Sequence, residues 1–463
     1  MRDRTSRREF LAGVGAGALC ATLGEKVLAF ADLEPDYRLE IAPLRLEIAP
    51  KKVIQTVAYN GRVPGPLIRW PENKRIRIQV TNRSDVPEIV HCHGLFTEPE
   101  MDGAMEEGSP MIAPSATFLY DFIPRPAGFR WYHTHAFAGR NLKRGTYSGQ
   151  FGCFFIEGKN NAGAYDQELF LTLHDWNAYM GGGEDASMDA LYDYGTINDR
   201  MLGFGEPIRV MENQRVLVHM LNASATVTHW IALAGHEMQV VAMDGNPVPR
   251  PASMPAVRLA TAERVDVVVK MNRPGVWVLG ETRKALRSAG TGIVVEYANQ
   301  SGAAKWIEPP PTTWDYAQFA NAAGAALKPD FEIPMVFESK FAGHGDFDRW
   351  TINGKSFPHT DTIALRQGNR YRLVMTNRSM DQHPIHLHRH TFEVTALGDK
   401  QLGGLRKDVV LIEPQTVSTV DFTADNPGCT LFHCHQQTHM DFGFMTLFSY
   451  AEGGSPGTKR RAD

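Results

Sequence analysis

The chain has 463 residues, of which 43% are hydrophobic and 22% are charged, and its formal net charge is −4. This length allows about two to four domains with a large buried core, and the slightly acidic balance offers no basic patch, so no nucleic-acid partner is expected. The 42 glycines and 28 prolines lie between short runs of Val, Ile, Thr and aromatic residues, which indicates an all-β protein with many turns.

The N-terminus has the pattern of an export signal. Ser6-Arg7-Arg8-Glu9-Phe10-Leu11 resembles a twin-arginine motif, and an apolar run from Ala12 to Leu23 and the small-x-small sequence Ala29-Phe30-Ala31 follow it. The apolar run is too short to span a bilayer comfortably, so no stable membrane insertion is expected. We expect residues 1–31 to be a signal peptide that the twin-arginine machinery recognises, which places the mature protein in the periplasm. The alternative is a short hydrophobic helix of the mature fold.

From residue 37 onward the chain contains an internal repeat. Residues 76–84, 216–224 and 371–379 each have the pattern of a strand that is closed by an Asn-x-Ser turn. In each copy a Pro-Gly or Ala-Gly pair opens a later strand, with the glycine at Gly128, Gly275 or Gly428. Three copies of both markers predict three similar domains, and Greek-key β-sandwiches fit their size.

The repeat gives the expected domain bounds. We place the three β-sandwiches at residues 37–160, 161–300 and 328–452. A linker at 301–327 contains Pro309-Pro310-Pro311, and the Ala-rich stretch 317–328 at its end is compatible with a short helix. The Gly181–Gly183 run predicts a surface loop, and residues 453–463 are expected to form a flexible tail.

Histidines follow this repeat in the first and third copies. Two His-x-His pairs stand at the same offsets from the repeat markers in both copies, at His91, His93, His133 and His135 and at His386, His388, His433 and His435. The middle copy has Ile231, Leu233, Gly280 and Thr282 at these offsets. Chance histidines would not respect a repeat, so we expect eight metal ligands to converge where the first domain meets the third. The second domain would then be a spacer.

A second metal site is expected in the third domain alone. Cys434 lies between two histidines of the first set, and strand alternation turns its side chain to the opposite face. The first copy has Thr134 and Glu88 where the third has Cys434 and His383. Two imidazoles and one thiolate, from His383, Cys434 and His439, are the ligand set of a blue-copper electron-transfer site. A structural zinc site needs a closed set of four ligands, which this set does not supply.

Four segments of the chain resemble the copper-binding motifs of the multicopper oxidases: His91-Cys92-His93-Gly94, His133-Thr134-His135, His383-Pro384-Ile385-His386-Leu387-His388 and His433-Cys434-His435-x₃-His439. The resemblance covers essentially the whole mature chain and is closest to three-domain bacterial laccases and copper efflux oxidases. It implies three cupredoxin-like domains and four copper ions. By motif position, the type 1 ion would bind His383, Cys434 and His439, and the type 2 ion would bind His91 and His386. The two type 3 ions would bind His93, His133 and His435, and His135, His388 and His433.

The resemblance also implies an activity. A reducing substrate would give up single electrons near His439, the electrons would pass through the Cys434 backbone, and O₂ would be reduced to water with four electrons. Phenols and aromatic amines are the expected donors, as in laccases, and Cu(I), Fe(II) or Mn(II) ions are the alternative. Met101, Met105 and Met111 make only a thin methionine cluster, which weakens the case for cuprous oxidation. A copper-free periplasmic scaffold of the same fold is a non-enzyme alternative, against which the intact ligands argue.

Two positions depart from the family pattern at the copper motifs. Cys92 stands where the family usually has Trp, and strand alternation predicts that it packs away from the copper. Phe444 stands ten residues after Cys434, where many members have an axial Met, so the resemblance implies a three-coordinate type 1 copper of relatively high potential. Met445 is adjacent, but alternation turns it away.

Proton supply and disulfides are less constrained by the motifs. Asp102 matches an acid that relays protons to the cluster in bacterial relatives, and a turn aspartate is the alternative. The second relay acid usually follows the His439 equivalent directly, where this chain has Met440, so Asp441 is the expected substitute. If Cys434 binds metal, then Cys92, Cys153 and Cys429 are an odd number of thiols and can form at most one disulfide.

Overall fold

The computed structural model describes residues 34–158, 165–180, 190–322, 328–343 and 347–450. The predicted signal peptide 1–31, the Gly181–Gly183 loop and the tail 453–463 lie outside these residues. Strands dominate the described chain and the few helices are short, so the predicted all-β class is confirmed. Within this part of the chain, no helix has the length and apolar character needed to cross a bilayer.

The first domain is a sandwich of two four-stranded sheets. One sheet has the order β2 (Lys52–Tyr59), β1 (Tyr37–Ala49), β4 (Ile76–Asn82), β6 (Thr117–Phe122), and the other has the order β3 (Ile68–Pro71), β8 (Phe151–Glu157), β7 (Gly128–Thr134), β5 (Val90–His93). Between the strands lie α2 (Pro99–Asp102) and the 3₁₀ turns η2 (Met105–Glu107) and η3 (Gly145–Tyr147). Apolar side chains from both sheets form one buried core, and Cys92 packs in it as predicted.

The second domain has larger sheets but no histidine pair on them. Its six-stranded sheet has the order β10 (Ala190–Ile197), β9 (Gln167–Met180), β12 (Arg215–Asn222), β17 (Arg264–Lys270), β14 (Met238–Met243), β15 (Asn246–Met254). Its five-stranded sheet has the order β11 (Ile208–Val210), β19 (Gly292–Tyr297), β18 (Val276–Glu281), β13 (His229–Leu233), β16 (Val257–Leu259), and α3 (Lys284–Ser288) precedes β19.

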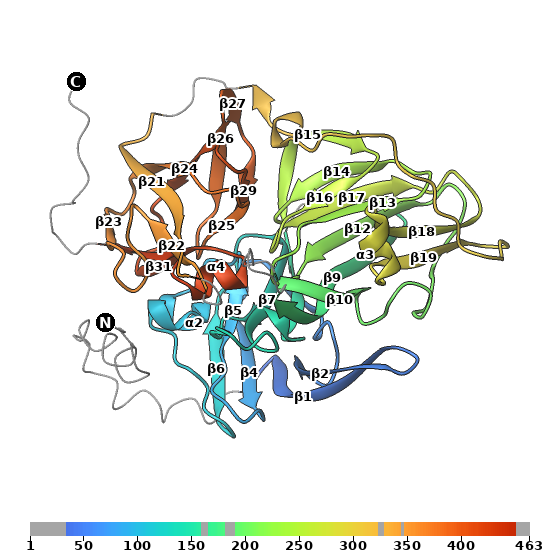
Figure 1. Cartoon of the computed structure of the whole chain (residues 1–463), viewed down its shortest axis with the longest axis horizontal. Coiled ribbons are helices and arrows are strands. Elements are labelled where there is room, and N and C mark those ends of the chain that lie inside the picture. The colour runs from blue at the N-terminus through green and yellow to red at the C-terminus, as the bar shows by residue number, and fades with distance from the viewer. Residues whose placement is uncertain (1–33, 159–164, 181–189, 323–327, 344–346, 451–463) are drawn as a thin grey trace.

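The third domain carries the remaining ligand strands. One sheet has the order β20 (Asn321–Ala322), β27 (Lys400–Gly403), β26 (Phe392–Leu397), β30 (Val417–Thr423), β24 (Arg370–Asn377), β21 (Phe331–Lys340), β22 (Arg349–Ile352), and β28 (Arg406–Lys407) pairs with β26. The other has the order β23 (Ile363–Leu365), β32 (Met445–Tyr450), β31 (Cys429–Cys434), β25 (His383–Leu387), β29 (Val409–Ile412), and α4 (Gln437–Asp441) follows β31. In Figure 1 this orange and red domain meets the blue first domain around β5, β7, β31 and α4.

The Asn-x-Ser turns of the repeat have one hydrogen-bonding pattern in all three domains. Asn82, Asn222 and Asn377 end β4, β12 and β24, and each is at most 1% exposed. Each side-chain Nδ2 donates to two backbone carbonyls at 2.7–3.0 Å, and each Oδ1 accepts from the backbone N–H of the serine two residues on. The side chain thus satisfies backbone groups that the strand end leaves unpaired.

Two of the three marker glycines stand where two domains touch. Gly128 and Gly428 have φ values of +116° and +118°, a region that side chains with a Cβ rarely adopt. A Cβ on Gly128 would lie 1.9 Å from the carbonyl oxygen of Gly245 in the second domain. A Cβ on Gly428 would lie 2.3 Å from Cγ of Pro99 in the first domain. Both glycines therefore allow close contact between domains just before a ligand strand begins.

The segment expected to be a linker is partly built into the sheets. Lys305 forms a parallel bridge with Trp277, and β20 pairs with β27. The short helix expected over 317–328 is wrong for the described part of that stretch, which holds one 3₁₀ turn, η4 (Tyr316–Gln318), and then β20. The turn begins where the Asp315 side chain accepts a hydrogen bond from the backbone N–H of Ala317. The domain bounds themselves stay a prediction.

Candidate metal centre

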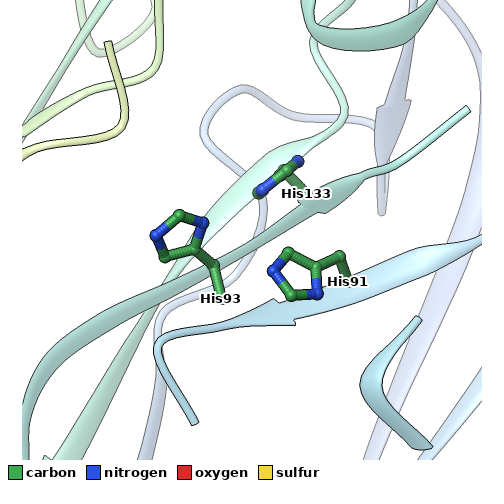
Figure 2. Close-up of side chains that lie close together, drawn as sticks. All are labelled: His91, His93 and His133. Atoms are coloured by element: carbon green, nitrogen blue, oxygen red, sulfur yellow. The ribbon is translucent and has the colours of Figure 1, made fainter. Parts of the chain in front are cut away.

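The eight predicted histidines lie together at the junction of the first and third domains. In the first domain His91 and His93 are on β5 and His133 is on β7, with His135 directly after that strand. Figure 2 shows the first three rings grouped around a common space. In the third domain His386 is on β25 and His433 is on β31, and His388 and His435 follow shortly after these strands. Alternate residues of an extended chain share a face, so each pair points the same way. All eight are buried, and the most exposed of them, His135, is 8% exposed.

Each first-domain ring packs against a third-domain ring. The ring centroids are separated by 3.8–5.2 Å in these cross-domain pairs, which are His93–His386, His91–His388, His133–His435 and His135–His433. The ligand nitrogens of His135, His388 and His433 also lie within 4.8 Å of one another, which is close enough to hold one ion. The structure therefore brings together the eight side chains that the repeat singled out, although their assignment to individual ions stays a prediction.

The ring nitrogens that face the centre lack hydrogen-bond partners. His91, His133 and His386 donate from Nδ1 to backbone carbonyls at 2.7–2.8 Å, and their buried Nε2 atoms have no partner. His135 and His435 have no partner for either nitrogen. Buried polar atoms are rarely left unpaired, and histidines that bind metal usually donate their other N–H to a carbonyl or carboxylate. The donor set therefore fits metal ions at the centre.

The Nε2 atoms of His388 and His433 face each other at short distance. His388 donates from Nδ1 to Asp102 Oδ2 at 2.7 Å, and His433 donates from Nδ1 to the Cys434 carbonyl at 2.9 Å. Their Nε2 atoms therefore both carry lone pairs, yet they lie only 3.0 Å apart. Burial lowers the pKa of His433 to about 3 and that of His388 well below its usual value, so a proton does not occupy this gap near neutral pH. A metal cation would relieve the repulsion.

The second predicted site is on the other side of Cys434. The Nδ1 atoms of His383 and His439 lie 3.1 Å apart, and Cys434 Sγ lies 3.7 and 3.5 Å from them. His383 Nε2 donates to Ser379 Oγ at 2.8 Å, which leaves a lone pair on Nδ1. Burial raises the pKa of the Cys434 thiol far above its usual value, so the thiolate requires a cation. Two nitrogens and one sulfur in this arrangement fit copper.

Comparison with known proteins identifies the family. Three family models, each described as multicopper oxidase, match residues 42–161, 167–302 and 332–454. This chain belongs to the multicopper oxidase family. Membership implies copper as the cofactor and three cupredoxin-like domains, and it confirms the expected class of oxidoreductase.

Relatives and solved structures cover nearly all of this multicopper oxidase. It is 28% identical to the multicopper oxidase MmcO of Mycobacterium tuberculosis over 97% of each chain, and 22% identical to a copper resistance protein A homolog of Pseudomonas syringae pv. tomato over 96% of this chain and 99% of that one. A multi-copper oxidase of Pseudomonas thermotolerans superposes with a TM-score of 0.72 at 25% identity, covering 90% of this chain and 98% of the other. Fet3p, a multicopper oxidase that functions in iron import, shares the fold with a TM-score of 0.76 at 20% identity over 89% and 90%.

Aromatic rings surround the Cys434 site of the oxidase. The Trp350 ring lies 4.0 Å from that of His439, and the Phe444 ring lies 4.8 Å from that of His383. Met445 packs instead in a separate cluster with Leu431 and Met440, as strand alternation predicts. The contact of Trp350 with His439 was not expected from the sequence, because the two residues are distant in the chain and share no motif.

Two buried carboxylates contact the histidine cluster of the oxidase at His388. Asp102 Oδ2 lies 2.7 Å from His388 Nδ1 and 3.0 Å from His91 Nδ1, so Asp102 touches ligands from both domains. Glu107 Oε1 lies 3.3 Å from His388 Nδ1 and accepts from the backbone N–H of Leu431 at 2.6 Å. Burial, reinforced by Asp102, raises the pKa of Glu107 well above its usual value. Sequence reasoning missed Glu107; the acidic pair Glu106-Glu107 was its only signal.

Asp441 lies beside the loop that follows His135 and not against the histidines themselves. Its carboxylate accepts from the backbone N–H groups of Ala138 and Gly139 at 3.1 and 2.8 Å and from Gln437 Nε2 at 2.9 Å. Burial raises the pKa of Asp441 to about 7. Of the two predicted relay acids, the structure thus places Asp102 in contact with the cluster and Asp441 one loop away.

The cysteines other than Cys434 are all free thiols in the described chain. Cys92 and Cys153 are buried in the first domain, and Cys429 is half-buried near the carbonyl of Glu106. The disulfide that the sequence left open among these three is absent from the described residues.

The first and second domains of the oxidase have different polar groups at the position that Cys434 occupies in the third. In the first domain Thr134 donates to Glu88 at 3.3 Å. In the second, Glu281 stands six residues after its marker glycine, as Cys434 does, and accepts from His229 Nδ1 at 2.9 Å. His229 Nε2 donates to Asp175 at 2.8 Å. The second domain therefore holds a buried imidazole between two carboxylates where the third holds its Cys434 site.

This imidazole makes stability depend on pH. Burial alone would lower the pKa of His229, but Asp175 and Glu281 outweigh it and raise the pKa from 6.5 to about 9. Its stabilising contribution is therefore complete below pH 6.5 and is lost as the pH rises through about 9. We expect the melting temperature to fall over this range, since a loss of about 1 kcal/mol lowers it by about 2–4 °C in a domain of this size. His219, whose pKa Asp266 and Glu168 also raise to about 9 against burial, adds to the slope.

Calorimetry of the copper-free protein across this pH range checks the prediction. The variant His229→Gln should unfold at a lower temperature near neutral pH and show a smaller loss as the pH rises. The exposed His359 provides the matched control variant His359→Gln, which should behave as wild type. An unchanged slope in His229→Gln would contradict the assignment.

Proposed function

We propose that the chain is a laccase-like oxidase with four copper ions, which couples the one-electron oxidation of phenols or aromatic amines to the four-electron reduction of O₂ to water. Copper at these sites would supply the one-electron chemistry and the storage of four electrons that this reduction needs. The observation that carries the proposal is the position of Cys434, which contributes to one ligand set while its chain neighbours His433 and His435 contribute to the other. We assign the ligands as the family motifs imply.

Two features of this chain support electron entry at His439. Of the three residues in the Cys434 set, His439 is 4% exposed, whereas Cys434 and His383 are fully buried. From Cys434 the route to the cluster is short, because His433 is bonded to it through the chain and also donates from Nδ1 to the Cys434 carbonyl at 2.9 Å. Covalent and hydrogen-bonded contact therefore join the two sites through one residue.

Protons must reach the cluster as well. Asp102 is suited to this task, because its carboxylate contacts His388 and His91 and also accepts from Thr97 Oγ1 at 3.0 Å. We assign Asp102 as the nearer proton-carrying group. Asp441, the last residue of α4, lies beside the loop after His135 and is assigned as the second group.

The surroundings of His439 favour aromatic donors. Trp350 covers its ring, and the acidic residue two positions on, Asp441, is half-buried with both carboxylate oxygens accepting hydrogen bonds. A cation would find little open negative charge in these residues. Steady-state O₂ uptake with a phenol panel, compared with Cu(I), Fe(II) and Mn(II), tests this choice, and faster uptake with a metal ion than with any phenol would contradict it.

A metal-ion oxidase is the second candidate. The names of several relatives refer to metals, including copper resistance protein A of Escherichia coli and iron transport multicopper oxidases of yeasts. In this chain Met105, a member of the methionine cluster of the first domain, is 45% exposed and can meet Cu(I) from solvent. Loss of Cu(I)-driven O₂ uptake in Met105→Leu, with phenol oxidation retained, would favour this candidate.

We also propose that residues 1–31 direct the folded protein through the twin-arginine route to the periplasm. The order of the arginine pair, the apolar run and Ala29-Phe30-Ala31 supports this proposal. An N-terminus of the exported protein that begins elsewhere than directly after Ala31 would contradict the cleavage site.

The variant Phe444→Met is expected to lower the redox potential of the Cys434 site. Phe444 is fully buried and its ring lies against His383, so a thioether at this position would lie close to the ligand set. Axial thioether coordination tunes the potential of such sites. Redox titration of the visible band checks the prediction, with Met445→Leu as the matched control on the neighbouring residue. An unchanged or raised potential in Phe444→Met would contradict the placement of Phe444.

A further inference from the structure

Six buried charged side chains lie where the three domains meet, beside the histidine cluster. Three are positive and three are negative, and none is more than 1% exposed: Arg130, Arg264, Lys407, Asp244, Glu263 and Asp408. The first domain contributes Arg130, the second contributes Arg264, Asp244 and Glu263, and the third contributes Lys407 and Asp408. Buried ions are costly unless they are paired and hydrogen-bonded, so this balance ties all three domains to one arrangement.

Asp408 is the member of this group that reaches the histidines. Its two carboxylate oxygens accept a paired contact from Arg264, with both distances at 2.6 Å, and Oδ2 also accepts from Arg130 at 3.0 Å. Oδ1 accepts from His93 Nε2 at 3.2 Å, and the backbone carbonyl of Asp408 accepts from His386 Nδ1 at 2.7 Å. One residue thus holds two of the stacked rings, and the arginines leave its carboxylate no free oxygen to act as a metal ligand.

The contact with Asp408 sets His93 apart from the other histidines. Five other rings of the cluster donate a hydrogen bond to a backbone or carboxylate oxygen, and all five donate from Nδ1 and turn Nε2 to the centre. His93 makes its bond through Nε2, and its buried Nδ1 has no partner. Because a carboxylate can only accept, Asp408 holds the proton on Nε2 and leaves the lone pair of His93 on Nδ1.

The chain next to His93 is shaped to admit this contact. Gly94 has a φ value of +80°. A Cβ at this position would lie 2.6 Å from Asp408 Oδ2 and 3.0 Å from Arg264 Nη2. Any other residue would therefore push the Asp408–Arg264 pair away from the ligand strand.

We propose that Asp408, held by Arg264 of the second domain, is a positioning residue that fixes the ring orientation and the ligand atom of His93 and His386. This inference rests on the proposed function, because it takes both histidines to be copper ligands. The second domain is then more than a spacer, since it supplies the guanidinium group that keeps Asp408 in place.

The variant Asp408→Asn tests the proposal. Asparagine keeps the shape of the side chain but replaces one acceptor oxygen with an NH₂ group. This group is a donor and faces the donors of Arg264, Arg130 or His93, so the hydrogen bond to His93 is lost. Loss of a group that orients a metal ligand typically weakens metal affinity about 10–100-fold. We expect a competing chelator to remove copper from the histidine cluster at a correspondingly lower concentration, together with a changed electron paramagnetic resonance spectrum of the type 2 copper. The blue band of the Cys434 site should be retained, because His383, Cys434 and His439 do not contact Asp408.

Two further variants separate positioning from stability. Glu263→Gln changes the same charged group, but Glu263 contacts Lys407 and not the histidines. This variant should lower the unfolding temperature and hold cluster copper as tightly as wild type does. Arg264→Lys keeps the charge but loses the paired contact, and it should release cluster copper more readily than Glu263→Gln does. If Asp408→Asn does not fold, the copper retention of Arg264→Lys tests the proposal in its place.

Three results would overturn the inference. These are wild-type retention of cluster copper in Asp408→Asn and Arg264→Lys, equal loss of copper from both sites in all three variants, and failure of both Asp408→Asn and Arg264→Lys to fold. A wild-type protein that binds copper only at the Cys434 site would instead contradict the proposed function itself.

Discussion

Replacement of Cys434 by serine is expected to abolish the blue absorption band and the oxidation of every donor. The side chain is fully buried between His383 and His439, and serine fits the space but offers a hard hydroxyl in place of a soft thiolate. Electron entry is lost with the thiolate, while the eight histidines of the other site are untouched. Visible absorption and O₂ uptake of the copper-loaded variant measure both effects, and copper analysis should show that the histidine cluster still binds metal.

Cys429 provides a matched control for this experiment. It lies on the same strand, β31, and is half-buried, and its sulfur lies 3.9 Å from the carbonyl oxygen of Glu106. Cys429→Ser should therefore keep the colour and the activity. A blue, active Cys434→Ser protein, or a colourless copper-loaded wild type, would refute the assignment of the site.

The variant Asp102→Asn is expected to slow O₂ reduction by about 10²-fold or more, which is the usual contribution of a positioned acid–base group. Asparagine retains one acceptor oxygen but cannot carry the proton that the carboxyl group passes on. Bleaching of the blue band by a donor under anaerobic conditions should remain as fast as in wild type, because Asp102 does not contact the Cys434 set. The return of the colour after addition of air should be slow, and stopped-flow absorption follows both steps.

Glu100 offers the control for Asp102. It belongs to the same short helix, α2, but its side chain is exposed. Glu100→Gln should reoxidise at the wild-type rate. Wild-type reoxidation in Asp102→Asn, with a full copper content, would show that the contacts with His388 and His91 serve only to hold the rings.

The repeat made much of the candidate site predictable because its markers have local physical causes. Asn82, Asn222 and Asn377 each close a strand end with the same set of hydrogen bonds, so counting from them gives structurally equivalent positions. Gly128 and Gly428 each stand before a ligand strand for a steric reason. A residue at a given offset from such a position therefore has an equivalent residue in the other domains. Strand alternation then predicts to which face of the sheet each side chain points.

Contacts between domains were not predictable in this way. Asp408, Arg264 and Arg130 come from three different domains, and no spacing in the sequence relates them. The one available signal was a charged residue pair, Lys407 and Asp408, directly before the apolar strand β29. Burial of these charges becomes favourable only when all three domains supply their counter-charges, which is a property of the assembled molecule.

The cross-domain ring pairs fix the order in which the molecule can be assembled. Every first-domain histidine has its ring partner in the third domain, and the buried charge that orients His93 is held from the second. A chain that ends before residue 408 has six of the eight histidines but lacks His433, His435 and Cys434, and its Arg130 and Arg264 have no Asp408 carboxylate to pair with, so neither site has its full set of donors. Metal binding and folding are coupled when the site exists only in the folded state. Copper capture is thereby reserved for the finished chain, and the metal content of a preparation becomes a direct measure of how much of it has folded to completion.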